Sequence, residues 1–151
     1  MTVVGDVIFV IGGAAGTFND VVYTFEVSRN RWSHFMANGS RPVGLYGHSA
    51  TYYPARNAIF VFGGYRFDLD RTGMSSMLTV LDLNRRRWIL MPSLMQENPL
   101  TLRAFHAAEY VMEGNYMIVA GGRTPNNLFD QSLLIFRFRC NGNYFPQVLP
   151  C

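Results

Sequence analysis

The chain has 151 residues, of which 49% are hydrophobic and 15% are charged, and its formal net charge is +3. This length allows one domain with a hydrophobic core, and the balance of apolar and charged residues excludes an intrinsically disordered chain. The small net charge gives no indication of a nucleic-acid partner, and no apolar run reaches the roughly 18 residues that a membrane span needs.

Three apolar segments that each end in a pair of glycines occur along the chain, the first of them near its N-terminus. They cover residues 7–11, 59–62 and 116–120, and the pairs that follow are Gly12-Gly13, Gly63-Gly64 and Gly121-Gly122. A continuously apolar segment of this length predicts a strand that is buried on both faces. Glycine at its end permits positive φ and lets a neighbouring backbone approach closely. The chain is therefore predicted to contain three copies of one β-rich unit.

Each glycine pair is followed by a further strand and, in the first two copies, by a tryptophan. These strands are predicted at residues 22–27, 78–83 and 133–138, and the first two show the period-two alternation of a half-buried strand. A short polar turn then leads to Trp32 and to Trp88 at the same spacing. In the third copy the tryptophan position falls near Tyr144.

A histidine motif repeats with the same offset as the glycines. Gly47-His48-Ser49-Ala50 and Phe105-His106-Ala107-Ala108 are 58 positions apart, and so are Gly63 and Gly121. Two independent features that share one offset indicate a true internal repeat. Because His48 and His106 recur in register, they are predicted to be structural residues that hydrogen-bond the backbone between strands. We expect no metal site.

Paired glycines, an aromatic or β-branched strand, and tryptophan after a short turn resemble the kelch repeat over nearly the whole chain. The resemblance implies a β-propeller of four-stranded blades, a fold whose kelch members usually act as protein-interaction platforms. We therefore expect an all-β chain, residues 1–151, that forms about three kelch blades of an incomplete propeller. The expected blades are blade a at 6–36, blade b at 44–91 and blade c at 103–146.

Blade a is expected to lack its first strand, because only Met1 to Gly5 precede its apolar segment. Three blades cannot close into a ring, since propellers have roughly 4 to 8, and unpaired strand edges would stay exposed. The chain is therefore interpreted as a segment of a longer protein. A closed assembly of several copies is the less favoured alternative.

Within the kelch group, the Gly-His-Ser-Ala opening and the long loop after Gly-Gly-Tyr are similar to the kelch region of attractin and the multiple-EGF-like-domain proteins. In that group a cysteine recurs a few residues before the tryptophan position, and Cys140 with Tyr144 matches this spacing. The resemblance implies a disulfide, for which Cys151 is one candidate partner and a cysteine outside this chain is another. Asn38-Gly39-Ser40 is an acceptor sequon for N-glycosylation, which favours an extracellular setting.

The predicted binding face follows from antiparallel connectivity. The loop between strands two and three emerges on the same face as the connection to the next blade, and these loops are long, whereas the hairpins on the other face are short. Function usually lies on long loops of a rigid scaffold, and aromatic and arginine side chains are enriched at interface hot spots. The predicted partner-binding residues are Tyr65, Arg66, Phe67, Arg71 and Arg123. An alternative is that Tyr65 and Phe67 only pack their own loop.

The leading functional hypothesis is a non-catalytic protein-interaction scaffold, extracellular or on the ectodomain of a membrane protein, without cofactor and without direct membrane insertion of this segment. The runner-up is an intracellular kelch adaptor that recruits a protein for ubiquitin ligation or cytoskeletal attachment. A copper enzyme resembling galactose oxidase is less favoured, because its tyrosine, histidine and cysteine constellation has no counterpart in this sequence. The identity of the protein partner stays open.

Overall fold

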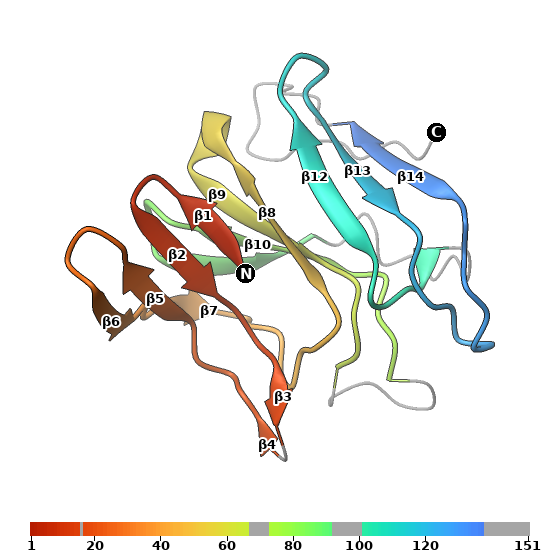
Figure 1. The fold of residues 1–151 in the computed structure, drawn as a ribbon, viewed down its shortest axis with the longest axis horizontal. Coiled ribbons are helices and arrows are strands. Elements are labelled where there is room, and N and C mark those ends of the chain that lie inside the picture. The colour runs from red at the N-terminus through yellow and green to blue at the C-terminus, as the bar shows by residue number, and fades with distance from the viewer. Residues whose placement is uncertain (16, 67–72, 92–100, 138–151) are drawn as a thin grey trace.

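The computed structural model describes residues 1–15, 17–66, 73–91 and 101–137. Within these ranges the chain forms three main sheets, largely antiparallel, that follow one another along the sequence and are the blades a, b and c (Figure 1). The chain also contains a short 3-10 turn, η1 (Pro54–Arg56), in one of the hairpins. The predicted all-β fold of about three propeller blades is confirmed.

Blade a is a four-stranded sheet in the order β1-β2-β5-β6. Its strands are β1 (Thr2–Val4), β2 (Val7–Val10), β5 (Tyr23–Glu26) and β6 (Arg31–His34). Thr2 pairs with Phe9 and Val4 with Val7, so the expectation that blade a lacks its first strand is wrong. A three-residue strand suffices because Gly5, at φ +59°, lets the chain reverse at once into β2. The connection from β2 to β5 carries a small ribbon of β3 (Ala14–Ala15) and β4 (Thr17–Phe18).

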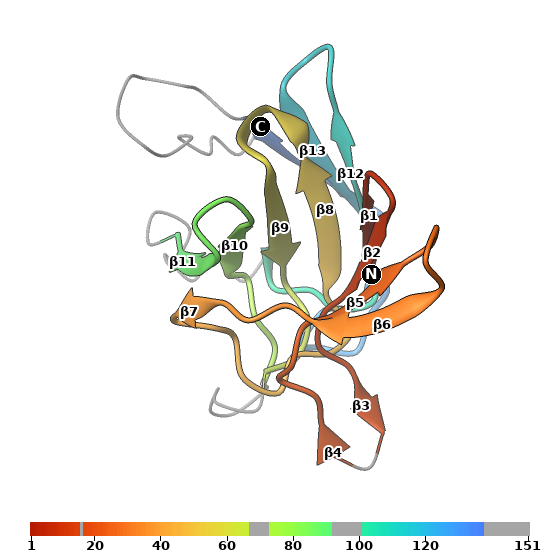
Figure 2. The ribbon, with the colours of Figure 1, turned by 90° about the vertical axis from the view of Figure 1, so that its left-hand side faces the viewer.

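Blade b has four antiparallel strands and one added edge strand, in the order β7-β11-β10-β9-β8. The strands are β7 (Asn38–Gly39), β8 (Ser49–Tyr53), β9 (Ala58–Phe62), β10 (Leu78–Asp82) and β11 (Arg87–Leu90). Strand β7 belongs to the connection from blade a to blade b and pairs in parallel with β11 (Figure 2). It covers backbone groups of β11 that would otherwise form an open sheet edge.

Blade c shows three strands within the described residues, in the order β12-β13-β14. They are β12 (Ala107–Val111), β13 (Tyr116–Ala120) and β14 (Leu133–Arg137). The predicted fourth-strand position near Tyr144 lies outside the described residues, as do Cys140 and Cys151. Between the described parts of blade a and blade c no strand pairing closes a ring.

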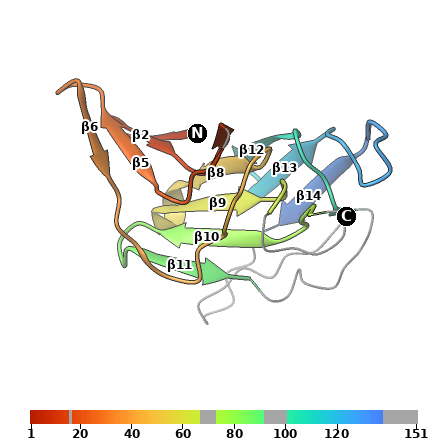
Figure 3. The same cartoon turned by 90° about the horizontal axis from the view of Figure 1, so that it is seen from below.

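The first strands of the three blades are neighbours, since β8 contacts both β1 and β12, and the sheets fan outward from them (Figure 3). Two apolar clusters fill the spaces between blades. The cluster between blades a and b consists of Phe9, Ile11, Val22, Leu45, Ile59, Val61, Leu81 and Trp88. The cluster between blades b and c consists of Tyr53, Ala58, Phe60, Phe62, Leu78, Val80, Met91, Met117, Val119 and Phe136. Because both faces of blade b are covered, every residue of β9 and β10 is buried.

The two repeated tryptophans differ in their environment. Trp88 is only 4% exposed because its face of blade b packs against blade a. Trp32 occupies the same register position in blade a, opposite Phe25 as Trp88 is opposite Leu81, yet it is 60% exposed. The corresponding face of blade a has no blade packed against it among the described residues. None of the described helical structure has the length and apolarity needed to cross a lipid bilayer.

Candidate functional site

The connections of the blades divide between two faces of the molecule. Among the described residues, the short hairpins that join first to second and third to fourth strands lie toward the top and upper left of Figure 1. The described parts of the connections between second and third strands, and of those between blades, lie toward the bottom. We call these the hairpin face and the loop face, and the loop face includes residues 44–47, 63–66, 101–106 and 121–132.

The lack of a side chain at the glycine pairs lets the backbone of blade entry segments pass close to the end of a second strand, and this contact positions the loop face. Gly63 has φ +65°, and a Cβ there would lie 2.6 Å from the carbonyl oxygen of Arg103 and 2.7 Å from His106. A Cβ on Gly64 would likewise lie 2.7 Å from the carbonyl oxygen of Tyr46. The backbone N–H of Gly64 donates to Arg103 O at 2.9 Å, so the segment that enters blade c is fixed against the end of β9. The entry segments of the blades are therefore rigidly placed.

The two repeated histidines lie at these crossings. The His48 and His106 rings lie against Gly12 and Gly63, just after the preceding blade's second strand, where a Cβ would come within 3.0 Å and 2.7 Å of them. His106 Nε2 also lies 2.9 Å from Ser49 Oγ. Burial is the main cause that lowers the pKa of both rings to about 4, so both are neutral at physiological pH. No cluster of three metal-ligating side chains exists within the described part of the chain.

A fully buried arginine joins the two loop-face segments of blade c. Arg103 is 0% exposed, and its Nη2 donates to Asp130 Oδ2 at 3.0 Å and to Ser132 Oγ at 3.3 Å. Its Nη1 donates to the carbonyl oxygen of Gly121 at 3.2 Å. These bonds tie the segment that enters blade c to the connection between β13 and β14. The sequence did not single out Arg103, because one arginine in a loop carries no signal of burial.

Three aromatic rings gather on the loop face where blades b and c meet. Tyr46 and Tyr65 stack with centroids 5.0 Å apart and planes at 17°, and their backbones exchange hydrogen bonds of 3.1 and 2.8 Å. The Phe105 ring lies 6.4 Å from Tyr46 and 6.0 Å from Tyr65. Its backbone N–H donates to Gly47 O at 2.7 Å, and its side chain is 60% exposed. We call Tyr46, Tyr65 and Phe105 the aromatic cluster.

Of the five predicted partner-binding residues, the structure describes three, and these three lie in different environments. Tyr65 lies in the aromatic cluster, while Arg66 turns its Nη1 toward Met77 Sδ at 2.9 Å and is half-buried. Arg123 exchanges two backbone hydrogen bonds with Ala104, the residue before Phe105. Phe67 and Arg71 lie outside the described residues.

Two members of the aromatic cluster, Tyr46 and Phe105, were not predicted. A signal for Phe105 existed in the repeat itself, because the offset of 58 that aligns the histidines aligns Phe105 with Gly47. Gly47 has φ +67° and Phe105 keeps φ +57°. A large aromatic residue thus stands where the sister copy has a left-handed glycine.

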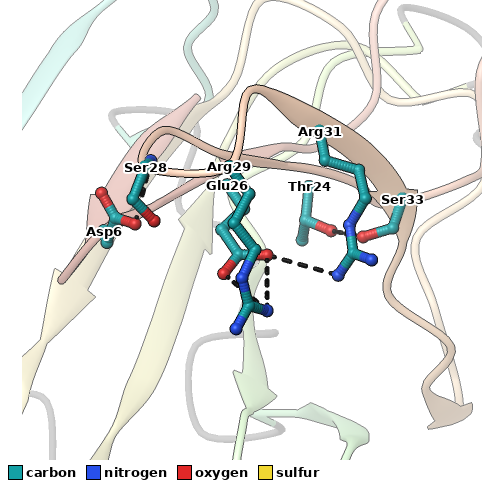
Figure 4. A network of polar contacts seen from close by, with 7 residues as sticks. All are labelled: Asp6, Thr24, Glu26, Ser28, Arg29, Arg31 and Ser33. Carbon is teal, nitrogen blue, oxygen red and sulfur yellow. Dashed lines mark hydrogen bonds and ion pairs between the residues drawn. The ribbon is translucent and has the colours of Figure 1, made fainter.

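The hairpin face of blade a is polar and solvated (Figure 4). Asp6 Oδ2 accepts a hydrogen bond from the Ser28 N–H at 3.1 Å. Glu26 forms ion pairs of 3.1 Å with Arg29 and 3.4 Å with Arg31, whose side chains are mostly exposed. Exposed pairs of this kind contribute about 0–1 kcal/mol and fix no concave site. The hairpin face is therefore a weaker candidate for binding than the loop face.

A family model described as the Attractin/LZTR1 beta-propeller matches residues 1–145 of the chain. Mouse (Mus musculus) multiple epidermal growth factor-like domains protein 8 is 33% identical over 129 residues, which are 85% of this chain and 4% of that protein. Rat (Rattus norvegicus) kelch domain-containing protein 3 is 34% identical over 122 residues, or 80% of this chain and 30% of that protein. A shorter match, 39% identical over 72 residues, covers 42% of this chain and 18% of the N-acetylneuraminate epimerase of Vibrio vulnificus. The chain therefore spans less than a third of each of these relatives.

Proposed function

The chain belongs to the Attractin/LZTR1 β-propeller family, and from that premise we propose that it binds a protein partner on the loop face, through the aromatic cluster and Arg123. Kelch propellers are in general protein-interaction domains, and the matched relatives include a kelch protein and a multiple epidermal growth factor-like domains protein. The observation that carries the choice of face is the exposed ring of Phe105, held beside two stacked tyrosines on a rigid scaffold. Exposed aromatic anchors on rigid scaffolds are the residues that dominate interface energetics.

The test compares one change on each face of the full chain. A protein partner is first isolated from a display library of ectodomains, and its dissociation constant is measured by biolayer interferometry. Tyr65→Ala is expected to weaken binding at least about tenfold, as hot-spot truncations do. The double variant Arg29→Ala with Arg31→Ala, on the hairpin face, is the control and is expected to leave binding unchanged. Loss of binding in the control with retention in Tyr65→Ala would assign the partner to the hairpin face instead.

The proposed setting is extracellular. Asn38 of the sequon lies in β7 at the outer edge of blade b, with its side chain exposed, so a glycan can be attached there without displacing the core. Expression through the secretory pathway is expected to give a product whose mobility increases after treatment with a peptide N-glycosidase, and Asn38→Gln is expected to remove this difference. An unmodified secreted product would contradict the assignment of Asn38.

An intracellular kelch adaptor is the second candidate, and sequence identity alone does not decide between the two settings. The chain is 33% identical to the multiple epidermal growth factor-like domains protein and 34% identical to kelch domain-containing protein 3. Localisation of the tagged full-length protein, with and without permeabilisation of the cell, distinguishes them. Antibody access without permeabilisation is the result expected from the extracellular proposal.

We propose that the module has no enzymatic activity of its own. The match to an epimerase covers less than half of this chain, and Arg103 and Asp130 of the loop face are engaged with each other in a structural ion pair. Purified protein is therefore expected to leave the anomerisation and epimerisation of N-acetylneuraminate, followed by proton NMR, at the uncatalysed rate. Stoichiometric copper in the purified full-length protein would favour the oxidase alternative.

A further inference from the structure

The backbone of Phe105 adopts a conformation that its side chain disfavours. At φ +57° the Cβ of an L-residue crowds its own backbone, and bulky residues rarely adopt this region. The other non-glycine residues with positive φ in the described part of the chain are Asn30, Asn57, Arg86, Asn115 and Asn127. Asparagine tolerates this region, whereas phenylalanine gains nothing from it, and the equivalent position in blade b is glycine.

Core packing does not account for phenylalanine at this position. The ring of Phe105 is 60% exposed and only leans on Gly47 and the edges of the two tyrosines. Strained non-glycine residues persist where the surrounding structure imposes them, and they concentrate at binding and active sites. Here the backbone of Phe105 is imposed by the hydrogen bond from its N–H to Gly47 O and by the close approach of its neighbours Arg103 and His106 to Gly63. The strained backbone of Phe105 therefore keeps its aromatic ring exposed to solvent.

The charges beside the cluster indicate the chemistry of what it meets. Arg123 is joined to Ala104 by backbone hydrogen bonds, and its Nε is buried with no hydrogen-bond partner among the described residues. The described carboxylates of the loop face are already engaged. Asp20 accepts from the Gly44 N–H and lies 4.0 Å from Arg41, and Asp130 pairs with Arg103. None of the described carboxylates of the loop face therefore complements Arg123, which is partly exposed.

We propose that the aromatic cluster is a docking platform for a protein segment in which an aromatic side chain is followed by a carboxylate. This inference rests on the proposed binding function and specifies the partner for the same face. The aromatic ring packs edge-to-face on Phe105 beside the Tyr46 and Tyr65 pair, an arrangement that aromatic pairs favour. The carboxylate accepts charge-assisted hydrogen bonds from the Arg123 guanidinium.

The deciding variant is Phe105→Gly, which copies the residue of blade b. Because glycine adopts φ +57° without strain, the unfolding midpoint of Phe105→Gly is expected to equal or exceed that of the parent protein. Phe105→Ala removes the same ring but keeps the strain, so its midpoint is expected to lie below that of Phe105→Gly. Phe105→Asn is a second strain-tolerant variant. A midpoint for Phe105→Gly below that of Phe105→Ala would show that the backbone is not strained, and midpoints of both variants well below that of the parent would show that the ring serves packing; either result would overturn the proposal.

The binding probe is the capped peptide acetyl-Gly-Trp-Asp-Gly-amide, titrated into the isotope-labelled full chain and followed by amide chemical shifts. Shifts at Tyr46, Tyr65, Phe105 and Arg123 are expected, with affinity about tenfold lower for Phe105→Gly, the size of one lost aromatic pair. Replacing Asp by Asn in the peptide and Arg123→Gln in the protein are expected to lower affinity equally and not additively, because both remove one interaction. Replacing Trp by Ala in the peptide is expected to abolish binding.

The outcomes separate this inference from the function on which it rests. Absence of peptide shifts, while Tyr65→Ala still weakens a natural partner, overturns the aromatic and acidic specificity but keeps the loop face. Peptide binding that Tyr65→Ala and Phe105→Gly leave unchanged overturns the site itself. Equal shifts with an N-acetylglucosamine oligomer would assign the platform to a carbohydrate and overturn the choice of a protein segment.

Discussion

At the scale of single residues, His48 and His106 link the packing of blades to pH. Each ring is held neutral by burial, with a pKa of about 4, whereas a histidine in the unfolded chain ionises near 6.5. Between these values the unfolded state binds more protons than the folded state, so the free energy of unfolding decreases as pH falls from 6.5 toward 4. Each unit of pKa difference corresponds to about 1.4 kcal/mol, so the combined loss is on the order of a few kcal/mol.

This pH dependence is measured by urea unfolding at pH 7 and at pH 5. The parent protein is expected to lose stability over this interval, and His106→Gln is expected to show a shallower loss, although it is less stable at pH 7. Carboxylate protonation is common to both proteins and cancels in the comparison. Parallel losses in the two proteins would contradict the role given to His106.

Two glycines share one backbone conformation but differ in their surroundings, so substituting each one distinguishes the cost of backbone strain from the cost of steric contact. Gly63 and Gly121 both have φ +65°, but a Cβ on Gly63 would meet Arg103 O at 2.6 Å, whereas on Gly121 it would meet only Asp130 O at 3.5 Å. Gly121→Ala is therefore expected to cost about 1–2 kcal/mol from backbone strain alone. Gly63→Ala is expected to cost clearly more in chemical denaturation, because blade c must also move. Equal costs would show that the crossing is loosely packed.

At the scale of elements, the segment that enters blade c depends on one ion pair whose arginine is buried. Arg103 is fully buried, while the side chain of its partner Asp130 is 21% exposed, so removing the carboxylate leaves a buried charge with neutral acceptors. Asp130→Asn is expected to lower the free energy of unfolding by about 1–3 kcal/mol. Glu26→Gln, which breaks exposed pairs on the hairpin face, is the matched control and is expected to cost about 0–1 kcal/mol. A small effect of Asp130→Asn in thermal and urea unfolding would show that Ser132 and Gly121 satisfy Arg103 by themselves.

The sequence predicted those strands whose own residues form a recognisable apolar or alternating pattern. The apolar segments before the glycine pairs became β2, β9 and β13 because both of their faces are buried or half-buried. In contrast, β1 has three residues and β7 has two, too few to show a period. They become strands because β2 and β11 offer free backbone groups beside them, a property of the neighbour and not of the segment. Tyr46 and Phe105 were not predicted for a similar reason, because their grouping with Tyr65 depends on how two blades meet and not on the local sequence.

At the scale of the whole molecule, one face of blade a is open although the equivalent face of blade b is buried. The row Ile59, Leu81 and Trp88 is buried between blades, while the matching row Ile8, Phe25 and Trp32 in blade a is half-buried or exposed. Exposed apolar patches of this kind promote association. The chain alone is expected to self-associate as its concentration rises in light-scattering chromatography.

Trp32→Ala is expected to shift this association to higher concentration without lowering the unfolding midpoint. Trp88→Ala removes a buried ring from the equivalent position and is expected to cost about 3–5 kcal/mol. The difference between the stability losses of the two variants measures how much a neighbouring blade contributes to the free energy of unfolding at this position. Similar stability losses would mean that Trp32 is already covered, by a second copy for example.

Strand β7 makes the outer edge of blade b depend on chain that leaves blade a. The N–H of Asn38 donates to Arg86 O at 2.9 Å, and Asn38 and Gly39 are the parallel partners of Arg87 and Trp88. Gly39 is so close to Trp88 O that only glycine fits there. Blade b therefore cannot keep its edge sealed once blade a has melted, and the two should open as one cooperative unit. In native-state hydrogen exchange the amides of β11 and of β5 would then share one opening free energy.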